Sequence, residues 1–306
     1  MERKLIPQGT KRNRSYTITL PMTWVKNNGL DALLNVNLDI IDNKILIGTE
    51  KIFKTKTTID ATNLDFIIKK LVAEKYKKGI DEIRINFKDT STLNLIRDLV
   101  EKELIGFEML EHTRTHCIIR DISKSCVESF EKTLRRCFHV LHDVGNEVVE
   151  ATSKQDYDYL PLIKNKDLDL NKLTYFCERQ LNKKNQEYFG KIQFYFFLLE
   201  RIENIGDMYK GICTFMLESK KPMQKNTIKL IQHLNQTLQS FIELFFSDNF
   251  DYEQAQDHYV DQREFRLKML DHYNPENPDL KYMYYIGSLV QANLGMTRCL
   301  FSLKET

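Results

Sequence analysis

One stretch near the middle of the chain repeats apolar residues at alternating steps of four and three. The residues are Leu198, Ile202, Ile205, Tyr209, Ile212 and Met216. Because an α-helix makes one turn about every 3.6 residues, this spacing places all of these side chains along one narrow stripe. Such a stripe is typical of a helix whose seam packs against other helices. The pattern therefore predicts a helical bundle.

The same character extends over residues 121–306. The chain has only 11 glycines and 6 prolines, and several of them fall at breaks between long periodic segments, as at Pro222 and Pro278. The breaks predict helices at residues 124–153, 158–187, 188–218, 222–248, 250–273 and 280–303. Two successive groups of three helices suggest an internal duplication.

Residues 1–57 have the alternation that is typical of strands. Apolar side chains alternate with threonines over residues 16–20, a half-buried strand pattern. Pro21 ends this pattern, because proline cannot donate a hydrogen bond to a sheet. The other predicted elements are a short helix at residues 22–27 and two strands, at 36–41 and 45–47, joined by a hairpin turn.

Residues 58–120 combine both patterns. Asp60 is predicted to cap a helix with an apolar face, and Gly79 is predicted to end that helix. The other predicted elements are a strand at 82–87, a helix at 90–104, and strands at 107–110 and 115–119. We therefore expect a multidomain, mainly α chain with a β-rich domain at 1–57, a small α/β domain at 58–120 and a helical bundle at 121–306.

Composition narrows the classes of function. The formal net charge is only +2, so attraction to nucleic acid would have to come from a local patch. The 6 cysteines include no Cys-x-x-Cys pair, which favours reduced thiols. No apolar run is long enough to span a bilayer, and the N-terminus lacks a signal-peptide core. We expect a cytoplasmic protein without membrane insertion.

No motif indicates an enzyme. The sequence contains no glycine-rich phosphate loop, no nucleophile elbow and no plausible catalytic triad. His112, His116 and Cys117 lie close together on a predicted hairpin, but zinc needs more ligands at better spacing. We interpret them as structural residues of the strand pair.

The N-terminal segment resembles the AbrB/SpoVT/MazE type of swapped-hairpin domain. The resemblance rests on residues 15–21, Trp24, Val25, Gly29, Leu30, 36–38 and 44–47. It implies that two chains interleave their hairpins into one β-barrel, so that each chain of a homodimer contributes half a barrel. A half-barrel this small could hardly bury its own apolar face.

The same resemblance implies DNA binding through basic residues around the first strand and its preceding loop. Carried over by position, these residues are Lys11, Arg12 and Arg14, with Ser15 as a hydrogen-bond donor to phosphate and Lys26 as a further basic residue. Arginine offers a fork of donors to phosphate oxygens, so we expect contacts to the DNA backbone rather than base reading. The alternative is that this run of charges is a solvated face.

The helical region resembles PhoU, the phosphate-uptake regulator family. The resemblance rests on residues 199–207 and 173–183. Glu203 and Asp207 fall on the family's acid–x–x–x–acid pair, and such pairs, one in each repeat, can hold metal ions in the family. The resemblance therefore implies two three-helix repeats and a candidate metal site at Glu203 and Asp207.

The sequence departs from that pattern in the second group of helices. Residues 285–293, which correspond to the first pair's position, contain no acidic pair. The absence of a second pair leaves few charged oxygens for tight metal binding. The alternative for Glu203 and Asp207 is an ion pair with Lys210 or Arg201.

Archaeal PhoU-like regulators join these three domains in the same order. The resemblance implies a dimeric DNA-binding transcriptional regulator linked to phosphate uptake or signalling, whose partners include DNA and a phosphate transporter or sensor protein. The alternative is a signalling adaptor that uses the half-barrel only to dimerise. An antitoxin-type protein is disfavoured, because its partner-binding part should be a short tail rather than a long packed bundle.

Overall fold

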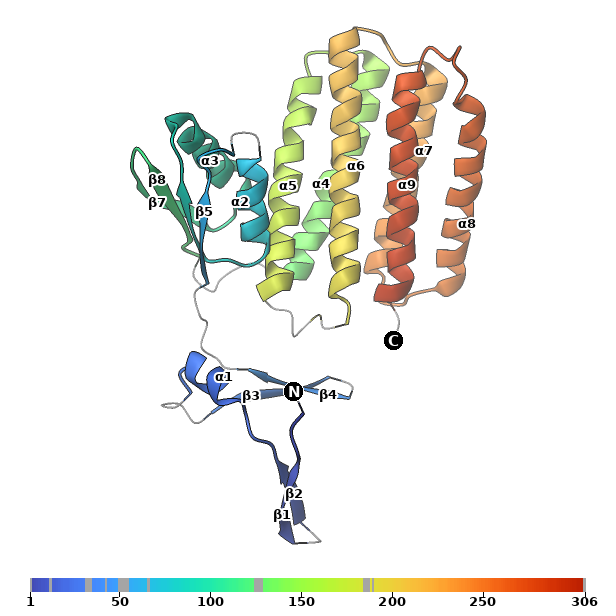
Figure 1. The fold of residues 1–306 in the computed structure, drawn as a ribbon. Helices are drawn as coiled ribbons and strands as arrows, with labels where there is room; N and C mark the ends of the chain where they lie inside the picture. Colours follow the sequence, from blue (N-terminus) through green and yellow to red (C-terminus); the bar gives the residue numbers. More distant parts are fainter. Residues whose placement is uncertain are drawn as a thin grey trace. The chain divides into compact units, whose positions relative to one another are not determined.

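The structure is a computed structural model. It describes residues 2–10, 13–30, 35–41, 43–48, 55–64, 67–123, 129–183, 188 and 190–304. Over these residues the chain is mainly helical (Figure 1). The chain divides into two compact units, residues 1–54 and 55–306.

The N-terminal unit contains two antiparallel hairpins and a short helix (Figure 1). The elements are β1 (Ile6–Thr10), β2 (Asn13–Thr17), α1 (Met22–Asn27), β3 (Asn37–Ile41) and β4 (Lys44–Gly48). The described strands form two separate two-stranded sheets, not a closed barrel. The helix and the second hairpin are confirmed, whereas the strand predicted at residues 16–20 begins at Asn13 and ends at Thr17.

The sequence pattern does not predict strand β1, because Pro7 and Gly9 interrupt the usual strand alternation. Gly9 has a φ of +94°, and a Cβ atom there would lie 2.2 Å from the backbone oxygen of Asn13. Only glycine combines this backbone conformation with so close an approach of the two strands. Gly9 therefore shapes the end of the first hairpin.

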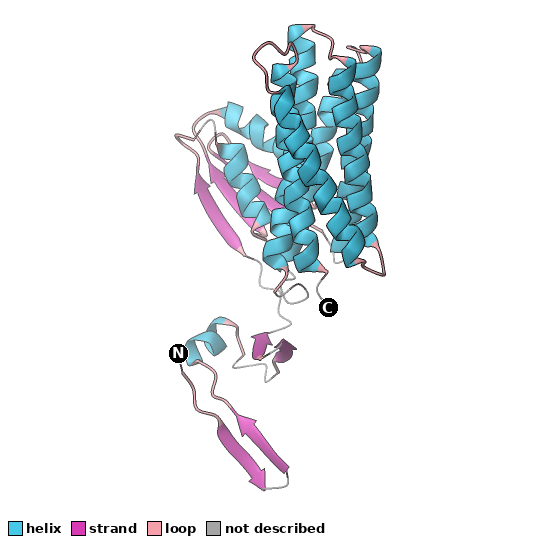
Figure 2. Cartoon of the chain, turned by 90° about the vertical axis from the view of Figure 1, so that its right-hand side faces the viewer, coloured by secondary structure: helices cyan, strands magenta, loops and turns pink. Residues whose placement is uncertain are grey.

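The second unit begins with a four-stranded sheet in the order β5-β6-β8-β7, in which only β5 and β6 are parallel. Its elements are β5 (Lys56–Asp60), α2 (Ile68–Lys77), β6 (Glu82–Asn86), α3 (Thr90–Glu103), β7 (Phe107–His112) and β8 (His116–Asp121). Ile83, Ile85 and Ile119 are fully buried in the core beneath the sheet. Figure 2 shows the helices of this part between the sheet and the bundle, in agreement with the packing of α2 and α3 against α5.

The structure differs from the sequence prediction at the start of this unit. Asp60 does not cap a helix, because it is the last residue of β5 and its carboxylate accepts hydrogen bonds from the amide and hydroxyl groups of Thr62, at 3.1 and 2.7 Å. Helix α2 begins only at Ile68. Residues 56–57, which the expected boundary at residue 57 places in the first domain, belong to β5. The α/β part and the bundle together form one compact unit.

The described part of the helical region contains the six predicted long helices. They are α4 (Phe130–Lys154), α5 (Leu160–Lys183), α6 (Ile192–Ser219), α7 (Lys225–Phe246), α8 (Tyr252–Met269, continued by the 3-10 turn η1, Leu270–His272) and α9 (Leu280–Leu303). All six residues of the predicted seam are buried on α6, which lies between α5 and α9 (Figure 1). Among the described residues, no helix is both long and apolar enough to cross a membrane.

Candidate functional site

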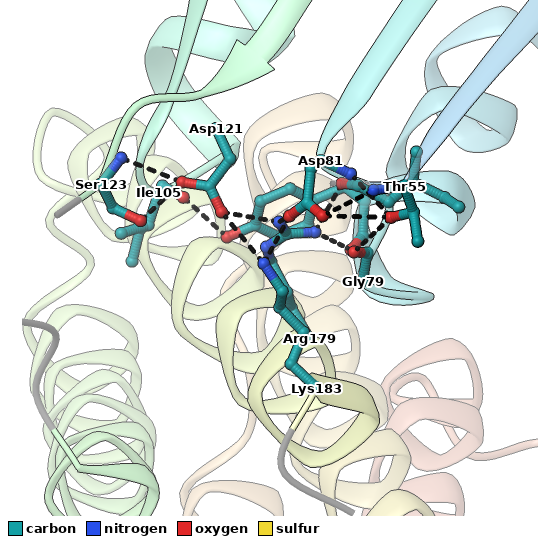
Figure 3. A network of polar contacts seen from close by, with 10 residues as sticks. Thr55, Gly79, Asp81, Ile105, Asp121, Ser123, Arg179 and Lys183 are labelled. Atoms are coloured by element: carbon teal, nitrogen blue, oxygen red, sulfur yellow. Dashed lines mark hydrogen bonds and ion pairs between the residues drawn. The ribbon is translucent and has the colours of Figure 1, made fainter. Parts of the chain in front are cut away.

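A buried network of charges joins helix α5 to the sheet (Figure 3). Arg179 is 3% exposed, and its Nη2 atom donates to Asp81 at 3.0 Å and to Asp121 at 2.7 Å. Lys183, one turn further along α5, also pairs with Asp81. Two basic residues of the bundle therefore meet two acidic residues of the α/β part.

Further partners of Arg179 also come from the α/β part. Its Nη1 atom donates to the carbonyl oxygens of Tyr76 and Ile80, at 3.0 and 2.7 Å. The guanidinium carbon lies 5.0 Å from the ring centre of Tyr76 and 4.9 Å from that of Phe107. A buried guanidinium group with this many partners holds its position firmly.

Electrostatics keep the carboxylates of this network ionised. Burial would raise the pKa of Asp81, but hydrogen bonds from Lys183 and from the Thr55 amide, together with the charge of Arg179, hold it below its ordinary value. The pKa of Asp121 is lowered too, since hydrogen bonds from Ser123 and Arg179 outweigh its burial. The network is thus neutralised within itself, and its role is to hold the α/β part on the bundle.

A second cluster, which is mainly acidic, lies where α5 and α6 meet Lys77 of α2. Glu178 of α5 and Glu200 and Glu203 of α6 each offer a carboxylate oxygen, and these oxygens lie within 4.8 Å of one another. Glu178 is 2% exposed; its Oε2 atom is 3.1 Å from the Lys77 ammonium group, while its Oε1 atom is buried without a hydrogen-bond partner. We call Glu178, Glu200 and Glu203 the acidic cluster.

Burial raises the pKa of both Glu178 and Glu203 to about 7. Lys77 opposes this shift at both residues, and Glu200 adds to it by repulsion. Carboxyl groups with such a pKa are partly protonated near neutral pH. They can therefore exchange a proton for a cation with little change in the charge of the site.

The structure places the two residues of the predicted metal pair in different surroundings. Glu203 belongs to the acidic cluster, whereas Asp207 is half-exposed and lies 3.8 Å from the ammonium group of Lys210. Lys210 is closer to Asp167, at 2.5 Å. Burial raises the pKa of Asp207, and the nearby Asp167 raises it further.

Sequence reasoning missed two members of the acidic cluster. Glu200 lies three residues before Glu203 on α6, so helical spacing was a usable signal. Glu178 carried no such signal, because it reaches the cluster from a different helix. Its membership depends on how α5 packs against α6.

The acidic cluster has the character of a site for a hard divalent cation. Carboxylate oxygens are the ligands that Mn²⁺ and Mg²⁺ prefer. The Oε1 atom of Glu178 is buried without a hydrogen-bond partner, and a bound metal ion would supply the missing partner. In a calorimetric titration with Mn²⁺, we expect Glu203→Gln to lower the affinity by about tenfold or more. Asp207→Asn, the matched change one turn away, is expected to lower it clearly less, because Asp207 lies outside the acidic cluster and acts on Glu203 only through its charge.

Two outcomes would contradict this expectation. Equal losses in the two variants would favour the metal pair predicted from the sequence over the acidic cluster. If the unmodified protein binds no Mn²⁺, the acidic cluster holds no metal ion, and Lys77 is the cation that pairs with it at Glu178.

Of the predicted DNA-binding residues, the structure describes Arg14 and Ser15 of β2 and Lys26 of α1. Lys11 and Arg12 fall between the last paired residues of β1 and β2, and they lie outside the described residues. Arg14 and Ser15 belong to β2, and both are exposed, as is Lys26 in the last turn of α1.

Arg14 and Ser15 lie on opposite faces of this hairpin. Arg14 is paired with Gly9 and Ser15 with Gln8, and consecutive residues of a strand direct their side chains to opposite sides. A flat surface laid against one face would contact only one of the two.

The second hairpin presents an apolar face to solvent. Its register pairs Leu38 with Ile47 and Ile40 with Ile45, and directly paired residues share a face. Leu38, Ile40 and Ile45 are 61%, 78% and 64% exposed. Among the described residues of 1–54, Leu30 alone is buried.

The histidines singled out from the sequence lie in a strand pair, as interpreted. The Nε2 atom of His116 is 3.1 Å from Glu111, and Cys117 is fully buried in the sheet core. In the described part of the chain, the acidic cluster is the one group with metal-ligand spacing.

The chain matches no protein-family model, no curated protein and no solved structure.

Proposed function

We propose that the chain is a homodimeric DNA-binding transcriptional regulator whose helical unit, by which we mean helices α4 to α9, receives a signal linked to phosphate supply. The observation that carries the proposal is the apolar face of Leu38, Ile40, Ile45 and Ile47. An isolated two-stranded hairpin is marginally stable at best in water, and an exposed apolar face of this kind marks an interaction site. Residues 55–306, by contrast, have hydrophobic cores of their own.

A second copy of the chain is the partner that the resemblance to swapped-hairpin domains favours. In such a dimer the two apolar faces would bury each other, and two basic hairpin tips would lie on one particle. Each chain has Lys11 and Arg12 in the sequence between β1 and β2, and Arg14 within β2. Contacts from these residues to six phosphates would make log affinity fall with log salt at a slope of about −5.

A DNA mobility-shift titration at low salt tests the proposal. Unmodified protein is expected to shift duplex DNA, with the salt slope given above. Changing Lys11, Arg12 and Arg14 together to alanine is expected to abolish the shift, because the removed charges supply most of the phosphate contacts.

The matched control removes the same charge from exposed lysines of the helical unit. Its three changes are Lys132→Ala, Lys225→Ala and Lys229→Ala. This variant should shift DNA as the unmodified protein does. If the unmodified protein shows no shift, or if both triple variants lose binding equally, the hairpin tips do not bind DNA.

The alternative function is a signalling adaptor whose hairpins serve only for dimerisation. The apolar face of the second hairpin accounts for a dimer without any DNA. This alternative predicts a stable dimer that does not shift DNA at any salt concentration. It also predicts that the helical unit captures a partner directly.

Both functions require the dimer, so we expect Ile40→Glu to convert the dimer to monomers. The change places a charge in the centre of the apolar face, where burial without a counter-charge is strongly unfavourable. Light scattering coupled to size-exclusion chromatography measures the mass. The control is Leu162→Glu, at a residue of α5 that is 57% exposed, and this variant should stay dimeric. If Ile40→Glu also remains dimeric, the apolar face of the second hairpin is not the dimer interface.

The link to phosphate rests on the resemblance of residues 199–207 and 173–183 to PhoU and on the order of the three regions. A phosphate transporter or a phosphate sensor is the corresponding partner protein. The acidic cluster lies within these two stretches, which supports the helical unit as the part that receives the signal.

A further inference from the structure

A groove of about 850 Å³ runs over helix α9 on the helical unit. Helix α9 lies between α6 and α8 (Figure 1). Helix α9 lines the groove with the small residues Gly287, Ser288 and Ala292, and α6 lines it with Arg201 and Met208. The other wall is the C-terminal end of α8 and the turn after it.

Two glycines of α9 leave room for side chains of this groove. A Cβ atom at Gly287 would lie 1.9 Å from the hydroxyl oxygen of Tyr273, which donates to the backbone oxygen of Met283 at 2.8 Å. A Cβ atom at Gly295 would lie 3.3 Å from the side chain of Arg201. The glycines thus admit Tyr273 and Arg201 against the backbone of α9.

Two arginines line the groove, and no acidic residue among the described ones does. Within the described part of the chain, neither Arg201 nor Arg266 takes part in an ion pair. The Nε atom of Arg201 is buried without a hydrogen-bond partner, and its guanidinium carbon lies 4.4 Å from the ring centre of Phe197. Because arginine stays charged, a partly desolvated guanidinium group without an anion is unfavourable, and a bound anion would relieve this cost.

The rest of the lining is largely apolar. Leu267, Leu270 and Tyr284 are 57%, 62% and 63% exposed. A volume within the range of small-molecule sites, an apolar lining and a few charged donors together are typical of a ligand pocket.

We propose that this groove binds a small amphipathic anion. Its carboxylate or phosphate group accepts hydrogen bonds from Arg201 and Arg266, and its apolar or aromatic body lies against Leu267, Leu270 and Tyr284. The site is separate from the acidic cluster and from the hairpin tips, and its occupancy does not depend on DNA binding.

Methionine-methyl NMR of the full-length chain tests the proposal, because Met208 and Met269 line the groove and Met22 reports on the exposed N-terminal unit. The probes are 1-anilinonaphthalene-8-sulfonate and N-phenyl-1-naphthylamine, which has the same aromatic body without the anionic group. We expect the sulfonate to shift the Met208 and Met269 signals saturably, at least about tenfold more tightly than the neutral probe.

Changing Arg201 and Arg266 together to glutamine is expected to weaken the sulfonate about tenfold or more at these signals, and to leave the neutral probe within about twofold. Arg263→Gln, one turn from Arg266 on α8, is the matched control and should bind as the unmodified protein does. Ser288→Phe, which fills the groove and keeps both arginines, should weaken both probes.

Three results would overturn the proposal. The first is the absence of saturable shifts at Met208 and Met269, including the case in which only Met22 shifts. The second is equal affinity of the two probes at the groove. The third is unchanged binding of the sulfonate in the double arginine variant, which the unaltered remainder of the methyl spectrum would show to be folded.

Discussion

Replacing Arg179 with alanine is expected to destabilise residues 55–306 by about 3–5 kcal/mol, the cost of removing one partner from a buried ion pair. The change leaves Asp81 and Asp121 buried with Lys183 as their remaining cation. It also removes the donors that the carbonyl oxygens of Tyr76 and Ile80 accept from. Urea unfolding followed by circular dichroism measures the loss.

The effect should be specific to the junction between the α/β part and the bundle. Arg136→Ala, at an exposed arginine of α4, is expected to change stability by less than about 0.5 kcal/mol. Arg179→Lys should fall between the two, because lysine keeps the charge and loses the fork of donors. A cost for Arg179→Ala below about 1 kcal/mol would show that the network contributes little net stability.

Raising the pH from about 5 to about 8 is expected to lower stability through Glu178 and Glu203. The pKa of each is raised from an ordinary value of 4.5 to about 7. Between those values the folded state binds more protons than the unfolded state, so the free energy of unfolding falls as the pH rises. The stability that the two protonated carboxyl groups contribute is fully present below about pH 4.5, and it is lost as the pH rises through about 7.

The size of this effect is best taken from a difference between variants. One pKa unit corresponds to about 1.4 kcal/mol. The full shift of Glu203 is not recovered as stability, because its side chain is partly exposed and its charge is coupled to that of Glu178. At pH 8 we therefore expect the free energy of unfolding of Glu203→Gln to exceed that of the unmodified protein by about 2 kcal/mol. At pH 4 the gain should vanish. Lys77, Glu200, Asp207 and Asp167 also act on these two groups, and the comparison leaves them all in place.

Thermal unfolding of both proteins across this pH range, in the presence of a chelator, measures the gain. Glu276→Gln, a matched change in the exposed loop before α9, should follow the unmodified protein at every pH. A gain from Glu203→Gln that is the same at pH 4 and pH 8 would contradict the assignment, since it could not come from ionisation.

The helices of the bundle could be predicted from the sequence because their signal is local. The seam from Leu198 to Met216 needs only helical periodicity, and every one of its six residues is buried. The second hairpin was also predicted, since its turn and its two strands are adjacent in the chain. By contrast, β1 was missed and Asp60 misassigned, because Pro7, Gly9 and Asp60 carry turn and cap signals that their packing overrides.

Glu178 and Arg179 show most clearly where the sequence stops. The sequence alone determined that they lie on a long helix, that α6 buries one stripe, and that bases gather near residue 12. The tertiary structure alone decided that Glu178 meets Lys77 and the carboxylates of α6, while Arg179 meets Asp81, 98 positions away. Periodicity reports which side of a helix is buried, but the partner of a buried charge is set by the packing of distant elements, which no local pattern records.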